Sequence, residues 1–262
     1  MPLRSSFATR TAAATLLVAL MAAGCDSPAP APKPAPAPTP ETQSAVAEPG
    51  PSPAASAPDG TAPLPIVLDS EDSLDIEVEK AEALARAGQW APAEAAYAAL
   101  LLKAPDHEEI HFNMAHLMAR TGRTNEAIAH YETALKLLPN YADAHNNLGN
   151  LLVRQKKYGE AITHFEAALQ VTDNDSSIYN NLGTALASSG RLAEAIPNFA
   201  RAAQLNPDYA EAWFNLGRSA LSLGRIDEAI PALETAVKLR PDLAPAMRTL
   251  EQAKQARKDR GY

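Results

Sequence analysis

Apolar and small side chains recur along residues 74–243 at a constant spacing. At 100° per residue, places 4, 7 and 11 of this repeat share one helical face, which holds mainly large side chains in the last four repeats. One column holds alanines and another holds aromatic or leucine side chains: Ala93, Ala127, Ala161, Ala195 and Ala229; Tyr97, Tyr131, Phe165, Phe199 and Leu233. The pattern predicts helix pairs that stack on one another and bury their apolar faces together.

Glycines and prolines mark the expected ends of these helices. The turn inside each pair is marked by Gly88, Gly122, Gly190 and Gly224, with Lys156 as the exception, and the repeats close at Pro105, Pro139, Pro207 and Pro241. A proline there cannot continue the helix. Pro197 and Pro231 are expected near the first turn of their helices, where a missing N–H has little effect. Small residues at places 8 and 20 should let the two helix backbones approach closely.

These columns resemble the tetratricopeptide repeat, a 34-residue helix–turn–helix with the pattern W-x2-L-G-x2-Y, then A-x3-F, then P. The segment 208–217, DYAEAWFNLG, is close to that consensus. We predict five repeats and an end helix, with the first repeat divergent, at 74–107, 108–141, 142–175, 176–209, 210–243 and 244–258. The resemblance implies an all-α solenoid over residues 66–262 that acts as a non-catalytic interaction scaffold.

Residues 1–65 have a different character. Arg4 and Arg10 precede an apolar run that ends in Ala23-Gly24-Cys25, as in a secretory signal peptide over residues 1–25. This ending resembles the lipobox of bacterial lipoproteins, which implies lipidation of Cys25; an ordinary signal peptide is the alternative. Residues 26–65 are rich in proline and alanine, which predicts a disordered tether of polyproline II character.

Lipidation would place the chain in the bacterial cell envelope, held to the membrane by its lipid anchor only and facing the periplasm. Asp26 follows the cysteine and resembles the enterobacterial signal for the inner membrane, with the outer membrane as the alternative. The net charge of −8 argues against a nucleic-acid partner or a polybasic membrane surface. A single cysteine excludes intrachain disulfides and cysteine-based zinc sites. No cofactor is predicted.

One short motif has the pattern of a catalytic metal site. Residues 107–111 read His-Glu-Glu-Ile-His, which matches the H-E-x-x-H of zinc peptidases, with Glu108 in the place of the base. Zinc catalysis needs a third protein ligand; Met114 occupies the glycine place of the longer motif, and Glu126 and Glu132 are expected in or near the second helix. We expect a helix start with a packed His111, and the peptidase remains an alternative.

The face opposite the packed one carries the candidate binding residues. Place 6 holds Asn113, Asn147, Asn181 and Asn215, and place 13 holds Arg86, Arg120 and Arg154. An amide can pair with both the C=O and the N–H of an extended chain. We expect the asparagines to hold the backbone of an envelope protein in a concave groove and the arginines to hold its carboxylates. Local hydrogen bonding and solvated charge are the alternatives, and self-assembly into homo-oligomers is a further one.

Overall fold

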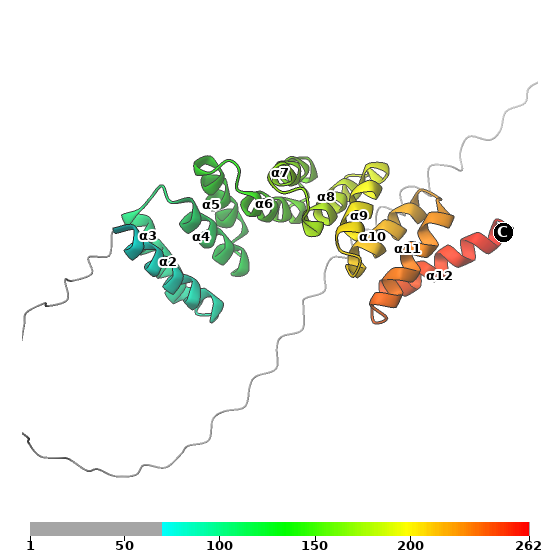
Figure 1. Ribbon diagram of the computed structural model, residues 1–262, viewed down its shortest axis with the longest axis horizontal. Helices are drawn as coiled ribbons and strands as arrows, with labels where there is room; N and C mark the ends of the chain where they lie inside the picture. Colours follow the sequence, from blue (N-terminus) through cyan, green and yellow to red (C-terminus); the bar gives the residue numbers. More distant parts are fainter. Residues whose placement is uncertain (1–69, 262) are drawn as a thin grey trace, which may run out of the picture. The chain divides into compact units, whose positions relative to one another are not determined.

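The computed structural model describes residues 70–261, and this part of the chain contains eleven helices and no strand (Figure 1). The predicted lipidation site Cys25 and the predicted tether 26–65 lie outside the described residues. Within 70–261, none of the helices combines the length and the apolar character that crossing a bilayer requires.

Five helix pairs are followed by one last helix, which confirms the predicted all-α architecture. The pairs are α2 (Ser70–Arg86) with α3 (Trp90–Lys103), α4 (Glu108–Arg120) with α5 (Thr124–Leu137), α6 (Ala142–Arg154) with α7 (Tyr158–Val171), α8 (Ser176–Ser188) with α9 (Leu192–Leu205), and α10 (Ala210–Ser222) with α11 (Ile226–Leu239), and the last helix is α12 (Ala244–Asp259). The first helix, α2, has 17 residues where α4 has 13, because it begins before the predicted repeat.

Each pair turns through one residue with a positive φ. Four of these residues are the predicted glycines, and the fifth is Lys156, with a φ of 61°. After each of them the chain closes the helix with a bond that reaches back to the last turn, as from the Lys157 N–H to the Leu152 carbonyl at 2.9 Å. Lys156 therefore takes the left-handed place that glycine fills elsewhere, although its Cβ makes that conformation unfavourable.

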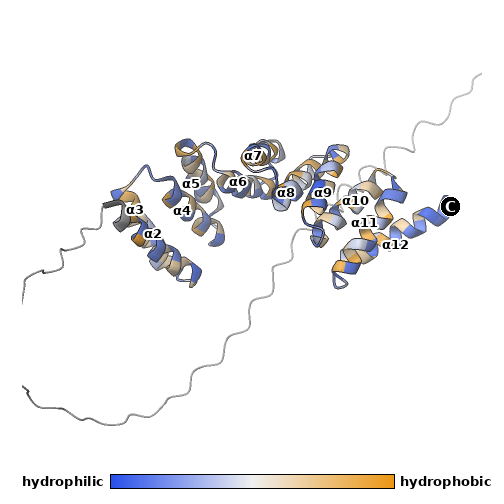
Figure 2. Ribbon diagram, viewed as in Figure 1, coloured by the Kyte–Doolittle hydropathy of each residue, from blue (hydrophilic) through white to orange (hydrophobic). Residues whose placement is uncertain are grey.

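The helices of a pair approach most closely where a glycine faces a large side chain. A Cβ on Gly183 would lie 2.7 Å from the Phe199 ring, and one on Gly149 would lie 2.7 Å from the Phe165 ring. Both phenylalanines are fully buried. The expectation that small residues at place 8 allow close approach is confirmed. Most helices carry hydrophilic as well as hydrophobic residues, as packing on one face requires, and much of α12 is hydrophilic (Figure 2).

The expectation for the two internal prolines is wrong. Pro197 and Pro231 are each the sixth residue of their helices, α9 and α11, and so lie beyond the first turn. Each removes a hydrogen bond to the carbonyl one turn earlier, in Ala193 and Asp227. Both prolines are exposed, so water can reach the helix surface at these positions.

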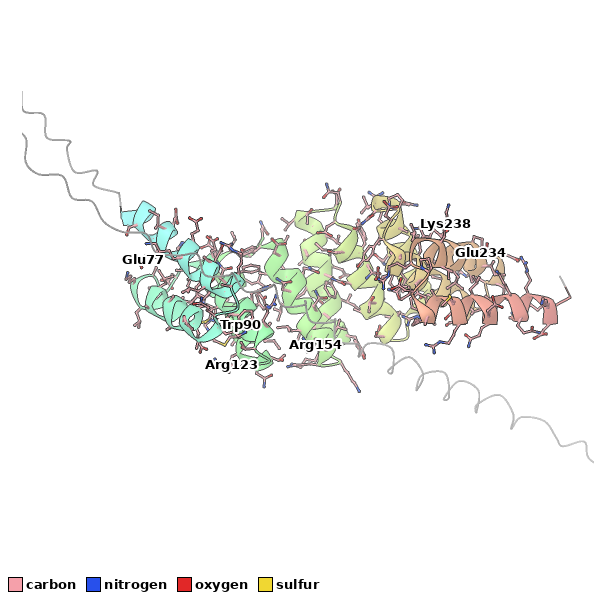
Figure 3. The ribbon with its side chains drawn as sticks, turned by 90° about the horizontal axis from the view of Figure 1, so that it is seen from below. Glu77, Trp90, Arg123, Arg154, Glu234 and Lys238 are labelled. Atoms are coloured by element: carbon pink, nitrogen blue, oxygen red, sulfur yellow. The ribbon has the colours of Figure 1, made fainter. Side chains whose placement is uncertain are left out.

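Successive first helices lie side by side and form one surface of the stack. Helix α2 contacts α4, α6 contacts α8, and both α8 and α12 contact α10. Ion pairs tie neighbouring segments together: Arg123 Nη1 lies 2.6 Å from Glu94 Oε1 of the preceding pair, and Lys103 Nζ lies 2.6 Å from Glu77 Oε2. Figure 3 labels Arg123 and Glu77, one member of each pair. These pairs are partly exposed, and each therefore contributes little to stability.

Candidate functional site

A hollow of about 510 Å³ lies on the surface formed by the first helices α2, α4 and α6. It brings together four of the seven residues predicted to bind a peptide, namely Arg86, Asn113, Arg120 and Asn147. Arg154, Asn181 and Asn215 do not line it. The predicted groove residues thus separate into a group around this hollow and a group farther along the chain.

Aromatic side chains that no repeat column identified also line the hollow. Trp90, the first residue of α3, lies under the Arg120 guanidinium, whose Cζ is 5.2 Å from the ring centroid. Phe112 of α4 stacks on Tyr141 with 4.7 Å between ring centroids. A guanidinium over an indole face is attracted by the ring's electrons, which favours one position of the Arg120 head group. The hollow therefore combines apolar surface with a positioned positive charge.

Two acidic residues line the hollow, Glu82 and Asp143, and Glu82 is engaged by its neighbours. Glu82 accepts a hydrogen bond from Asn113 Nδ2 at 2.9 Å and pairs with Arg86 Nη1 at 3.0 Å. Burial raises the pKa of Tyr97 to about 12, and the charge of Glu82 adds to this effect, so the hydroxyl keeps its proton at neutral pH. Arg120 makes no ion pair within residues 70–261. Its charge is therefore not neutralised by a carboxylate of this part of the chain.

The histidine of the hollow stays neutral at physiological pH. Partial burial lowers the pKa of His116 below its ordinary value of 6.5, and the positive charge of Arg120 lowers it further. Tyr131 of α5 does not line the hollow; burial raises its pKa well above its usual range, while a hydrogen bond from Asn147 acts in the opposite direction. Asn147 thus bonds Tyr131 and also lines the hollow.

The asparagines farther along the chain bind each other across repeat boundaries. Asn181 Nδ2 donates to Asn146 Oδ1 at 3.0 Å, and Asn215 Nδ2 donates to Asn180 Oδ1 at 3.0 Å. The donors lie at place 6, which the sequence pattern predicted as a binding position, and the acceptors lie at place 5, which it did not. The signal was present as two consecutive asparagines in two successive repeats, 146–147 and 180–181. These bonds use one of the two donors of each amide for the stack itself.

The H-E-x-x-H motif does not assemble a catalytic zinc site. His107 lies before the first residue of α4, and both ring nitrogens of His111 are engaged: Nε2 lies 2.9 Å from the Pro105 carbonyl oxygen and Nδ1 lies 3.0 Å from His130 Nδ1. Within residues 70–261, no three His, Cys, Asp or Glu side chains come together to hold a metal. The residues described here therefore give the peptidase alternative no support.

A second histidine pair repeats this geometry in the next repeat. His145 Nε2 lies 3.0 Å from the Pro139 carbonyl oxygen, and His145 Nδ1 lies 2.9 Å from His164 Nδ1. The two partners have the same separation along the chain in both pairs, and His145 occupies the repeat place that His111 has one repeat earlier. These pairs were not predicted from the sequence, because the two histidines recur in only two of the five repeats.

Comparisons with known proteins identify the repeat. Three family models, described as tetratricopeptide repeat or TPR repeat, match residues 119–156, 140–205 and 180–244. A comparison with curated proteins found no match.

Solved structures agree in fold. YrrB, described as a TPR protein with an unusual peptide-binding site, is 23% identical with a TM-score of 0.61, over 69% of this chain and 94% of that chain. PilF of Pseudomonas aeruginosa is 19% identical with a TM-score of 0.64, over 72% and 86%. MamA of Desulfovibrio magneticus RS-1 is 23% identical with a TM-score of 0.57, over 70% and 97%. The chain therefore carries tetratricopeptide repeats and folds as a tetratricopeptide-repeat α-solenoid.

Proposed function

We propose that the chain is a non-catalytic protein-interaction scaffold of the bacterial envelope, which binds a segment of a partner protein at the hollow on α2, α4 and α6. One observation carries the proposal. The hollow groups positive charge, amides and aromatic surface in one place, through Arg86, Arg120, Asn113, Asn147 and Trp90.

The chemistry of the hollow favours an acidic, partly apolar peptide. Arg120 offers a guanidinium that is held by Trp90 and makes no ion pair within residues 70–261, so it can take a carboxylate in a bidentate bond. Asn147 lines the same hollow, and an amide can bind the C=O or N–H of an extended backbone. A volume of about 510 Å³ suits one or two side chains, with the rest of the segment lying along the surface.

The relative YrrB supports the proposal through its fold, since its structure is described as having a peptide-binding site. Asn181 and Asn215 already donate to Asn146 and Asn180, which supports a proposal that centres on the hollow. In this proposal the distal asparagines hold the repeats together, and Asn147 contacts the partner.

Placement in the envelope rests on the sequence of residues 1–65. Lipidated Cys25 would anchor the chain, and the Pro/Ala tether would hold the solenoid away from the membrane. Metabolic labelling with an alkyne-bearing palmitate checks this part separately. Wild type should incorporate the label and Cys25→Ala should not. Labelling that survives in the variant would contradict lipidation of Cys25 and would leave the proposal for the hollow unaffected.

Two arginines at the same repeat place provide a matched test of the hollow. Arg120 and Arg154 are both exposed at the last residue of a first helix, and only Arg120 lines the hollow. In-cell crosslinking with mass spectrometry should recover a partner from wild type and Arg154→Gln, and recover at least about tenfold less from Arg120→Gln, the effect of losing roughly 1.4 kcal/mol.

Circular dichroism should first show equal helical content in the three proteins. Equal capture by Arg120→Gln and wild type would overturn the assignment of the hollow. Equal loss in both variants would indicate that positive charge along the surface matters and that the hollow is not a specific site.

A further inference from the structure

Two histidine pairs join the helices of the second and third repeats. His111 Nδ1 of α4 lies 3.0 Å from His130 Nδ1 of α5, and His145 Nδ1 of α6 lies 2.9 Å from His164 Nδ1 of α7. The ring centroids are 5.2 Å apart in both pairs, so the two rings lie almost in line and each contact is one N–H···N hydrogen bond. All four side chains are half-buried, and none of them lines the hollow.

The carbonyl contacts determine the direction of each N–H···N bond. A carbonyl oxygen only accepts, so His145 Nε2, 3.0 Å from the Pro139 oxygen, carries the hydrogen, and Nδ1 of the neutral ring is a lone pair. His164 Nδ1–H is therefore the donor, and His145 Nδ1 is the acceptor. The first pair has the same arrangement.

Each pair can take one extra proton without losing its hydrogen bond. That proton goes to Nε2 of His164, whose Nδ1–H still donates, so the bond becomes charge-assisted. A second proton can go only to His145 Nδ1, because Nε2 of that ring already carries a hydrogen. Two N–H groups would then face each other across 2.9 Å, on two positive rings with centroids 5.2 Å apart. The second proton therefore separates the rings.

Carboxylates act on the second pair. Burial and the charge of the partner ring lower the pKa of His164 below its ordinary value of 6.5, while Glu132 of α5 and Glu160 of α7 act in the opposite direction. Glu160 also lies 3.9 Å from Lys157. Helix α8, which packs on α7, has no charged side chain. Because the unfolded chain binds the proton more readily, the contribution of the pair to stability is present above about pH 6.5 and is lost as the pH falls.

A guanidinium acts on the first pair. Burial and the charge of His111 lower the pKa of His130, Glu126 raises it, and Arg123 lowers it further. Arg123 in turn donates to Glu126 and to Glu94 of α3. We therefore expect acid to separate the second pair at a higher pH than the first.

The fifth repeat shows what the histidines add. Trp213 occupies the place of His145, and its Nε1 donates to the Pro207 carbonyl at 2.9 Å. A tryptophan thus makes the same carbonyl contact with a ring that takes up no proton. The fourth and fifth repeats contain no histidine, so they serve as a reference within the same chain.

We infer that the two histidine pairs form an acid-sensitive link between helices, which holds α4 on α5 and α6 on α7 near neutral pH and releases them when acidification adds a second proton to a pair. Helices α4 and α6 also line the hollow, so release changes the surface of that site. This consequence rests on the proposed function, whereas the link itself does not.

Hydrogen exchange of the purified full chain, followed by mass spectrometry and corrected for the intrinsic effect of pH, tests the inference. Between about pH 7.5 and about pH 4.5, protection of α5 and α7 should fall at least about tenfold more than that of α9 and α11, with α7 responding first. Equal losses in all four helices would overturn the inference, because general destabilisation by acid does not distinguish the repeats. This result is independent of any partner and of binding at the hollow.

A double variant removes one ring of each pair. In His130→Asn/His164→Asn, the amide can donate to a neutral ring or accept from a charged one, and the fourth repeat already has Asn198 at this place. The acid response of α5 and α7 should then match that of α9 and α11. The matched control His116→Asn removes a histidine outside both pairs and should keep the wild-type response. A selective response that survives in the double variant contradicts the link.

A second measurement needs no variant. Nitrogen NMR of the wild type should detect coupling between the two Nδ1 atoms of each pair across the hydrogen bond at neutral pH. The coupling should vanish at the pH at which α5 and α7 lose protection. Absence of the coupling at neutral pH, or loss of protection while the coupling persists, would show that the pairs do not link the helices in this way.

Discussion

Asn181 donates a hydrogen bond to Asn146 across the boundary between the third and fourth repeats, with 3.0 Å between Nδ2 and Oδ1. Both side chains are half-buried, so losing the donor leaves an acceptor only partly reached by water. We expect Asn181→Ala to lower the free energy of unfolding by about 1 kcal/mol. Urea denaturation followed by circular dichroism would show this as a lower midpoint with an unchanged slope.

Asn140→Ala is the control, because Asn140 is exposed in a loop, and its effect should stay within about 0.5 kcal/mol. A double-mutant cycle with Asn146→Ala isolates the pair, and we expect a coupling of about 0.5–1.5 kcal/mol. Additive effects of the two changes would show that the asparagines do not support each other, and would return Asn181 to the group of binding candidates.

The contact between Gly183 and Phe199 leaves no room for a larger residue at position 183. A Cβ at Gly183 would lie 2.7 Å from the ring, and the ring is fully buried, so it has little room to move. Gly183→Ala should therefore lower the free energy of unfolding by about 1–3 kcal/mol, although alanine is the better helix former. Thermal unfolding followed by far-ultraviolet circular dichroism measures the loss.

Gly159→Ala is a control of opposite sign. Gly159 lies in α7, and a Cβ there would have no atom within 4 Å. The same substitution should raise the free energy of unfolding by about 0.5–1 kcal/mol. If both variants lost stability equally, close packing of the two helices could not explain the glycine at place 8.

The helix pairs could be predicted from the sequence because their determinants repeat. Each glycine at place 8 meets the large side chain of the second helix in its own repeat, so a column alignment shows the contact several times, as with Gly149 and Phe165. The expectation failed at Pro197 because this proline is the sixth residue of α9 and is exposed, so water can reach the helix surface where the hydrogen bond is missing.

The candidate site was only partly predictable, because some of the residues that shape the hollow do not repeat. Trp90 occurs at a place that holds Thr124, Tyr158 and Leu192 in the next repeats, so no column identified it. Its position under Arg120 depends on how the first two pairs stack. Bonds between repeats, such as that from Asn181 to Asn146, escape a projection of one helix because the donor and the acceptor lie on different helices.

We expect replacement of Lys156 by glycine to stabilise the protein. It is the turn residue of the third repeat and has a φ of 61°, whereas the other turns have glycine. The left-handed conformation costs a residue with a Cβ roughly 1–2 kcal/mol. Because glycine also loses more entropy on folding, we expect Lys156→Gly to raise the free energy of unfolding by about 1 kcal/mol. Chemical denaturation at two salt concentrations separates this gain from the loss of a surface charge.

The reciprocal change, Gly190→Ala, should lower stability by about 1 kcal/mol, since a Cβ there meets no atom within 4 Å and the penalty comes from the backbone alone. Lys156→Ala serves as the charge control and should leave stability within about 0.5 kcal/mol of wild type. A gain as large as that of the glycine variant would locate the effect in the lysine side chain and contradict the conformational explanation.

The protonation of His116 can be used to follow the charge in the hollow. Partial burial and the charge of Arg120 lower its pKa below 6.5 in the folded chain, so the unfolded chain binds the proton more readily. The contribution of His116 to stability is thus present above about pH 6.5 and is lost as the pH falls towards the folded pKa. Titration of its ring by NMR should give a midpoint below 6.5.

Arg120→Gln should raise the midpoint of His116, but not fully to 6.5, because burial is the larger cause and remains. Arg154→Gln, outside the hollow, should leave the midpoint unchanged. A wild-type midpoint at or above 6.5, or no response to the loss of Arg120, would contradict the electrostatics described here. A bound carboxylate at Arg120 adds negative charge beside His116, so binding of an acidic peptide should raise the same midpoint. This response distinguishes occupation of the hollow from binding elsewhere on the solenoid.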